Sequence, residues 1–168
     1  MEQEVHKIFS YNVYTNKVFD PLGLLMPITM SRRLFLQKLW SLKLAWDESF
    51  EFVDNLAVEW LNLVKETHIA ITSTFERNAV LTKASEVHIF SDASLQAYGA
   101  VMYIRTPPSP ECPKGHVHLT FAKGKVAPLD GKQTVPKLET AGVLVGAHLV
   151  PFVTKAFNLP KETKFFLW

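Results

Sequence analysis

The sequence predicts an α/β protein in which an α-helical hairpin precedes a mixed β-sheet. In the first half, apolar residues recur at the three- and four-residue steps of amphipathic helices. From Glu86 onward, short β-prone runs replace this pattern, and one further helical stripe separates the third run from the fourth. The predicted division is a helical segment at 1–80 and a sheet domain at 86–168, with a linker at about 72–85.

Composition restricts the class of protein. The 168 residues are 48% hydrophobic and 20% charged, which is typical of a chain that forms a core. The formal net charge of +2 is too small to indicate a nucleic-acid partner by itself. The single cysteine, Cys112, excludes an intramolecular disulfide and favours a reducing compartment, the cytoplasm or nucleus. No apolar run approaches the ~20 residues of a membrane span, so no membrane partner is expected.

Two helices are predicted in the first half. The first is expected to begin near Pro27, with Thr29 or Ser31 as its N-cap. Its apolar stripe comprises Ile28, Phe35, Leu39, Leu42 and Trp46. The second is expected to be capped by Asp47 or Ser49. Its apolar face comprises Val53, Leu56, Trp60, Leu63 and Val64. The cations of the first helix are expected on a solvated face, the alternative being contact with a nucleic-acid backbone; they are Arg32, Arg33, Lys38 and Lys43.

The second half predicts three strands, a helix and a strand. Strands are expected at 86–92, 98–105, 116–122 and 164–168, and a loop with four prolines separates the second from the third. The helix opens at Pro136 and carries Leu138, Ala141, Val145 and Leu149 on one face. Pro151 removes a helical hydrogen bond at a cost of about 3 kcal/mol, so the helix is expected to kink or end there.

Several segments resemble known families. Phe90–Ser94, followed by Tyr98–Val101, resembles the first two strands of ribonuclease H, and Pro136–Ala141 is similar to the start of that family's first helix. Upstream, Lys17–Pro27 resembles the signature that follows the polymerase core in BEL/Pao-type retrotransposon polyproteins. Other segments match that family in the same order: Leu36–Trp40, Trp46–Glu48 and Lys123–Pro128, the last being similar to the stretch between strand three and the helix.

The resemblance implies the connection region of a reverse transcriptase joined to an incomplete ribonuclease H-like domain. The implied activity is Mg²⁺-dependent cleavage of RNA in RNA–DNA hybrids during reverse transcription, with the rest of the polyprotein as a partner. Asp92 and Glu139 fall on the family's first two catalytic positions and would be ligands of magnesium, of which the complete domain holds two ions. The family's third carboxylate follows the fourth strand, which here ends at Trp168, so the isolated chain is expected to be inactive. The alternative is a non-catalytic relic or a host-adopted fragment that binds nucleic acid or protein.

Ordinary structural roles compete with these assignments. An Asp after a strand is commonly a turn residue, and a Glu in a first helical turn commonly complements the helix dipole. The occurrence of Asp92 and Glu139 in family order favours the ligand interpretation. Lys123 and Lys125 are weaker candidates for phosphate contacts. A zinc site is disfavoured, because no second Cys/His pair completes the set formed by Cys112, His116 and His118. The other two histidines of this half, His88 and His148, are expected to be partly buried packing residues.

Overall fold

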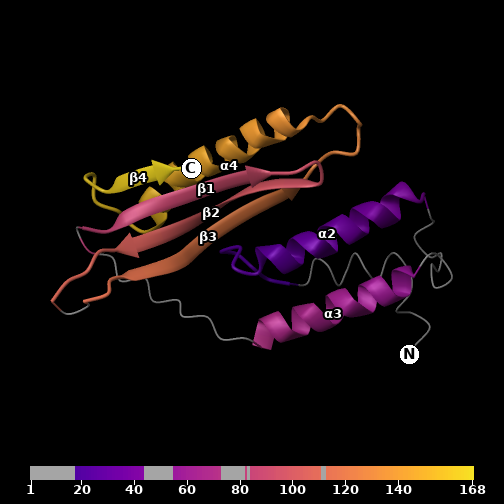
Figure 1. The fold of residues 1–168 in the computed structure, drawn as a ribbon, viewed down its shortest axis with the longest axis horizontal. Coiled ribbons are helices and arrows are strands. Elements are labelled where there is room, and N and C mark those ends of the chain that lie inside the picture. Colours follow the sequence, from indigo (N-terminus) through magenta and orange to yellow (C-terminus); the bar gives the residue numbers. More distant parts are fainter. Residues whose placement is uncertain (1–17, 44–54, 73–81, 83, 111–112) are drawn as a thin grey trace. The chain divides into compact units, whose positions relative to one another are not determined.

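The computed structural model describes residues 18–43, 55–72, 82, 84–110 and 113–168 (Figure 1). The chain divides into two compact units. The helical unit comprises Met1–Pro21 and Leu25–Thr74, and the sheet unit comprises Leu22–Leu24 and Phe75–Trp168.

Two helices pack together in the helical unit through a small apolar cluster. They are α2 (Met26–Ser41) and α3 (Leu56–Thr72). The buried side chains between them are Phe35, Leu39, Leu56 and Trp60. All four belong to the two predicted stripes, so the helical pairing is confirmed. Trp46, Val53, Asp47 and Ser49 lie outside the described residues.

The predicted solvated face of α2 is wrong for Arg32. Its side chain is only 4% exposed, and its guanidinium carbon lies 5.2 Å from the ring centre of Trp60. Burial lowers the pKa of Arg32, because desolvation disfavours the charged form. Attraction between a cation and an aromatic face offsets part of that cost. Lys38 is exposed as predicted and forms an ion pair with Glu59 of α3 at 2.7 Å.

The predicted N-cap of α2 is also wrong. The helix begins at Met26, and the hydroxyls of Thr29 and Ser31 donate to the carbonyls of Met26 and Pro27 inside it. Asp20 satisfies a donor at this end instead, because its Oδ2 accepts from the backbone N–H of Leu25 at 2.9 Å.

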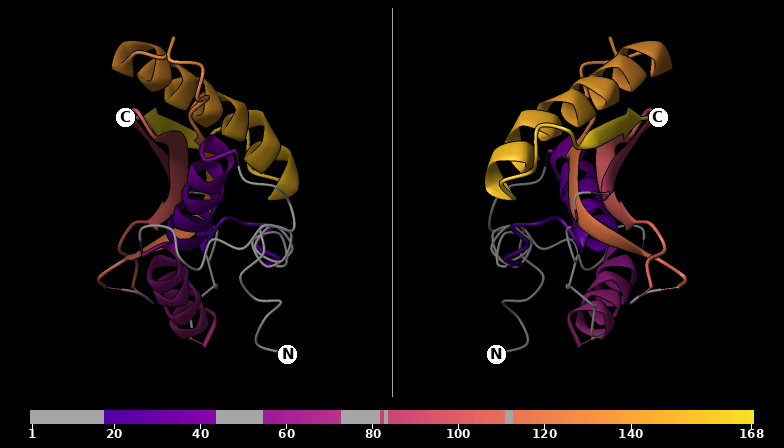
Figure 2. Two further views of the ribbon diagram at one scale, coloured as in Figure 1. Left: turned by 90° about the vertical axis from the view of Figure 1, so that its right-hand side faces the viewer. Right: turned by 90° about the vertical axis from the view of Figure 1, so that its left-hand side faces the viewer.

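The sheet unit has the predicted succession of three strands, a helix and a fourth strand. Its strands are β1 (Glu86–Ala93), β2 (Ala97–Thr106), β3 (His116–Val126) and β4 (Lys164–Leu167). Their order in the sheet is β3-β2-β1-β4. The pairs β1–β2 and β2–β3 are antiparallel, whereas β4 is parallel to β1. The helix α4 (Val135–Ala156) supplies the crossover from β3 to β4, and Figures 1 and 2 show it along the sheet.

Alternate residues of the strands build the core beneath α4. Val87 and Ile89 of β1 are buried together with the β2 residues Ala100, Met102 and Ile104. From α4 the buried residues are Val145, Leu149 and Val153, at the four-residue steps that define one helical face. The helix passes closely over the strands, because Gly146 has no Cβ; one placed there would lie 3.2 Å from Cγ2 of Ile89.

Of the two outcomes expected at Pro151, a kink or an end of the helix, the end is wrong, because α4 continues to Ala156. Pro151 lies on the exposed side of the helix, and so does Ala147, whose carbonyl loses its helical partner and can bind water. The actual end is set by Asn158, which has a φ of 48° and is followed by buried Leu159. The Leu159 N–H donates to the Thr154 carbonyl at 3.0 Å, which closes the helix in a Schellman motif.

The segment Leu22–Leu24 contacts the free edge of β3 at Ala122. The Ala122 N–H donates to the Leu22 carbonyl at 2.8 Å. Gly23 has a φ of 72°, and a Cβ built there would lie 1.9 Å from the Ala122 carbonyl oxygen. Only glycine fits this position, because the φ is positive and a side chain would collide with the backbone of β3.

The core beneath α4 gives a stability prediction. Leu149→Ala should lower the free energy of unfolding by about 2–5 kcal/mol, because it leaves a cavity in a packed core. Leu144→Ala, on the same helix at 55% exposure, should change it by no more than about 0.5 kcal/mol. Urea denaturation measures both variants. Equal losses from the two would contradict the assigned packing face of α4.

Candidate functional site

Asp92 lies near the carboxyl end of β1, as the sequence predicts. It pairs with Gly99 of β2, and its side chain is exposed. Its Oδ1 accepts from the N–H of Ala93 at 2.8 Å, a local contact that leaves Oδ2 available for another ligand. The carboxylate is therefore fixed by the strand end and open to solvent.

Glu139 is an exposed residue near the start of α4. The helix is preceded by Thr134 as its N-cap, which makes Glu139 its fifth helical residue rather than part of its first turn. The expected position in the first turn is wrong, because α4 begins at Val135. Charge–dipole stabilisation falls off within the first turn, so the dipole explanation for Glu139 loses weight.

The structure brings the start of α4 against the end of β1. Gly142, one turn after Glu139, would place a Cβ 3.1 Å from the Asp92 carbonyl oxygen and 3.4 Å from that of Gly99. Such distances mean that the helix backbone touches the sheet at this point. The two carboxylate-bearing segments are thus neighbours, although 47 positions (139 − 92) separate them in the sequence.

Side-chain alternation along β1 places Asp92 on the face of the sheet that is turned away from the core beneath α4. Val87 and Ile89 of β1 face the core beneath α4, so Asp92, an odd number of residues away, starts from the opposite face with Phe90. That Asp92 and Glu139 face one another stays a prediction.

A cluster of three metal-ligating side chains is absent from the described part of the chain. There, no three His, Cys, Asp or Glu side chains come together in an arrangement able to hold a metal ion. The rings of His116 and His118 lie 5.4 Å apart, and Cys112 lies outside the described residues.

Lys123 and Lys125 lie on β3 rather than after it. The strand extends to Val126, because its pairing with β2 continues to Ala97. Both lysines therefore lie in the ladder, on the face that packs under α4, and the predicted end of the third strand at residue 122 is wrong.

A cavity of about 300 Å³ lies beside these lysines, between β3 and α4. Its lining residues are Phe121, Lys123, Lys125, Val145, His148, Leu149 and Phe152. The expectation that His148 is a partly buried packing residue is wrong, because the residue is exposed and lines this cavity. Sequence patterns could have indicated the site, since 121, 123 and 125 alternate along a strand while 145, 148 and 152 share a helical face.

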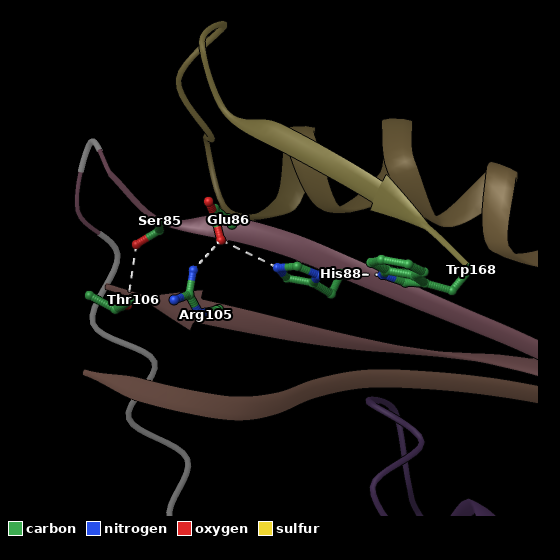
Figure 3. Close-up of polar contacts among 6 residues, drawn as sticks. All are labelled: Ser85, Glu86, His88, Arg105, Thr106 and Trp168. Carbon is green, nitrogen blue, oxygen red and sulfur yellow. Dashed lines mark hydrogen bonds and ion pairs between the residues drawn. The ribbon is translucent and has the colours of Figure 1, made fainter. Parts of the chain in front are cut away.

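A second polar cluster lies on the other face of the sheet. Glu86 Oε2 accepts from Arg105 Nη1 at 2.6 Å and lies 3.4 Å from His88 Nε2 (Figure 3). Trp168 Nε1 donates to His88 Nδ1 at 3.4 Å, and the Nε2 side of the ring faces Glu86. Stacking of His88 on Phe166, with ring centres 4.8 Å apart, adds to the contact between β1 and β4. His88 is partly buried, as predicted, and the cluster joins three strands.

With this geometry established, the comparison with protein families identifies the chain. The model for the Pao retrotransposon-like RNaseH-like domain matches residues 12–168. The chain belongs to this family. The match confirms the retrotransposon resemblance and the ribonuclease H-like fold class, and it extends over both units. No curated protein matches the chain. No helix among the described residues is long and apolar enough to cross a membrane.

The cluster around Glu86 predicts a pH dependence of stability. The hydrogen bond from Arg105 lowers the pKa of Glu86 below its usual value of 4.5, and the pair with His88 acts in the same direction. The unfolded chain therefore binds a proton at this carboxyl at higher pH than the folded chain does. The resulting stabilisation is present above the unfolded value of 4.5 and is lost as the pH falls through the lower pKa of the folded chain.

Glu86→Gln tests this assignment. The variant should be less stable than the parent at pH 7, and the difference in free energy of unfolding should shrink at pH values below ~4. Glu162→Gln, at an exposed position, serves as the control and should show no such convergence. A stability difference that stays constant from pH 7 to pH 3 would assign Glu86 a purely steric role. Urea denaturation at each pH gives the values.

Proposed function

We propose that the sheet unit serves ribonuclease H chemistry in a retrotransposon polyprotein, and that Asp92 and Glu139 are its metal-binding carboxylates. The substrate would be the RNA strand of an RNA–DNA hybrid formed during reverse transcription. The helical unit would be the connection segment that follows the polymerase. The observation that carries the proposal is the contact of α4 with β1, which sets Gly142 against the Asp92 carbonyl one turn from Glu139.

The donor chemistry of this pair suits magnesium. Mg²⁺ prefers hard oxygen ligands and is commonly held by one or two carboxylates together with several waters. Asp92 and Glu139 are both exposed carboxylates, so water can complete the shell of one ion. Bound magnesium would supply Lewis acidity for phosphodiester hydrolysis.

The contribution of this chain is to position the two ligands. Strand pairing with Gly99 fixes the backbone of Asp92, and the packing of α4 through Gly142 fixes the helical turn that carries Glu139. Repulsion between two carboxylates held close together would be relieved by a cation, which couples metal binding to the local fold.

A non-catalytic role is the second candidate, and one observation favours it. The described residues contain no group of three metal-ligating side chains, whereas catalysis with two ions needs further ligands. In that case the chain would be a relic or a host-adopted fragment that binds nucleic acid or a protein. Metal binding at Asp92 and Glu139 separates the two candidates, because a fragment without metal chemistry has no need of that pair.

The first test is metal binding. Asp92→Asn and Glu139→Gln should each weaken Mn²⁺ binding, used as a probe of the magnesium site, by about tenfold or more, since each removes one anionic ligand. Glu162→Gln removes an exposed carboxylate elsewhere in the sheet unit and should leave the affinity unchanged. Calorimetric titration measures the affinities. Equal affinities of all four proteins would remove the case for Asp92 and Glu139 as ligands.

The second test is hydrolysis. A polypeptide of these 168 residues should cleave an RNA–DNA hybrid only at a rate close to background with Mg²⁺ or Mn²⁺. Two carboxylates are too few to hold two ions against one phosphate in a preorganised site. A gel assay that compares this polypeptide with its Asp92→Asn variant measures the rate. Rapid cleavage that Asp92→Asn abolishes would show that the chain supplies enough ligands for catalysis.

A further inference from the structure

The cavity between β3 and α4 combines cationic groups with an apolar wall. Lys123, Lys125 and His148 line it together with the rings of Phe121 and Phe152. Its volume of about 300 Å³ is at the lower end of the range for small-molecule sites. No Asp or Glu is among the described residues that line it.

Strand alternation explains why the two lysines face the same cavity. Phe121 lies on the sheet face that packs under α4, and residues two and four positions later lie on that face as well. Pairing agrees, because Lys123 lies opposite Ala100, whose side chain is in the same core. The Cα atoms of the two lysines are therefore about 7 Å apart, two strand residues along β3.

The helix supplies the other wall. Val145, His148, Leu149 and Phe152 lie at steps of three and four and share one face of α4. Val145 and Leu149 are buried against the sheet, whereas Phe152 is 52% exposed. The rings of Phe152 and Phe121 lie 5.2 Å apart and form an aromatic corner beside the cations.

The cations of the cavity are available for a ligand. Within the described part of the chain, neither lysine nor His148 has an ion pair or a side-chain hydrogen bond. Two ammonium groups held on one face of a strand repel each other, and an anion between them would remove that repulsion. Lysine binds phosphate as a point charge, and a π-face beside it suits a nucleobase.

We propose that the cavity between β3 and α4, called the groove from here on, binds a phosphate ester of a nucleotide. The phosphate would lie between Lys123, Lys125 and His148, and the attached base against Phe152. The phosphate can come from a nucleic-acid strand or from a free nucleotide. The inference deepens the proposed nucleic-acid function and rests on it for the biological source of the phosphate. It is independent of metal binding by Asp92 and Glu139.

The experiment measures binding of the 168-residue chain to three probes in EDTA. The probes are a labelled single-stranded RNA of about a dozen adenosines, adenosine monophosphate and inorganic phosphate, the last two as competitors. Lys123→Gln/Lys125→Gln should weaken RNA binding about tenfold or more. It should also reduce the slope of log affinity against log salt by about 1.4, the value for two lost phosphate contacts on a single strand. Lys123→Arg/Lys125→Arg should retain binding.

Lys132→Gln/Lys161→Gln is the matched control, because it removes the same charge from two exposed positions outside the groove. It should weaken RNA binding less than twofold. Phe152→Leu should weaken the RNA and the mononucleotide but not inorganic phosphate. If the natural ligand is a nucleic-acid strand, the RNA should bind much more tightly than the mononucleotide. If it is a free nucleotide, the two affinities should be equal.

Two results would overturn the groove assignment. One is an equal loss from the groove pair and the control pair, which would mean that only net charge matters. The other is the absence of binding by all three probes at millimolar concentration. Because EDTA excludes metal, a failure of Asp92→Asn to alter Mn²⁺ binding would refute the metal-ligand proposal and leave this one standing.

Discussion

The close approach of α4 to β1 and β2 is the constraint on which both candidate sites depend. Gly142 and Gly146 are one turn apart, and a Cβ at either would come within 3.2 Å of the sheet. Gly142 meets backbone oxygen, which cannot rotate away, so any side chain there would lift the helix. Glu139 lies one turn before Gly142, and His148 lies two residues after Gly146. A shift of α4 would therefore displace a wall of each site.

The sheet register places the two sites at one end of the molecule's sheet unit. Asp92 pairs with Gly99, and Gly99 pairs with Gly124, the residue between the two groove lysines. With about 4.8 Å between strands, the Asp92 backbone is roughly 10 Å from that of β3. The lysines point toward the α4 face, whereas Asp92 starts from the other face. A nucleic-acid strand that reached both would have to pass around the strand ends rather than along one face.

Local patterns predicted most of this fold because local chemistry determines it. Val87 and Ile89 lie two residues apart because one face of β1 is buried, and that spacing is readable without coordinates. The predicted end at Pro151 is wrong because the free-energy cost of a proline inside a helix depends on whether the freed Ala147 carbonyl reaches water. The orientation of the helix on the sheet decides this. The helix ends instead at Asn158, which adopts a positive φ and precedes a buried leucine, a pattern typical of helix C-termini.

The candidate sites are harder to predict because they depend on how side chains are oriented once the helices and strands have packed together. Asp92 and Glu139 follow from family order, but whether their side chains face one another depends on how α4 packs on the sheet, which local patterns do not determine. Arg32 shows the same difficulty: its charge predicts a solvated residue, and only the partner helix shows that the ring of Trp60 lies beneath it. The prediction that His148 is a packing residue fails for the same reason. Whether a face of a helix is exposed or buried depends on which side chains of the neighbouring strand lie opposite it. On β3 that neighbour is a pair of lysines, so the same helical position lines a cationic groove instead of a core.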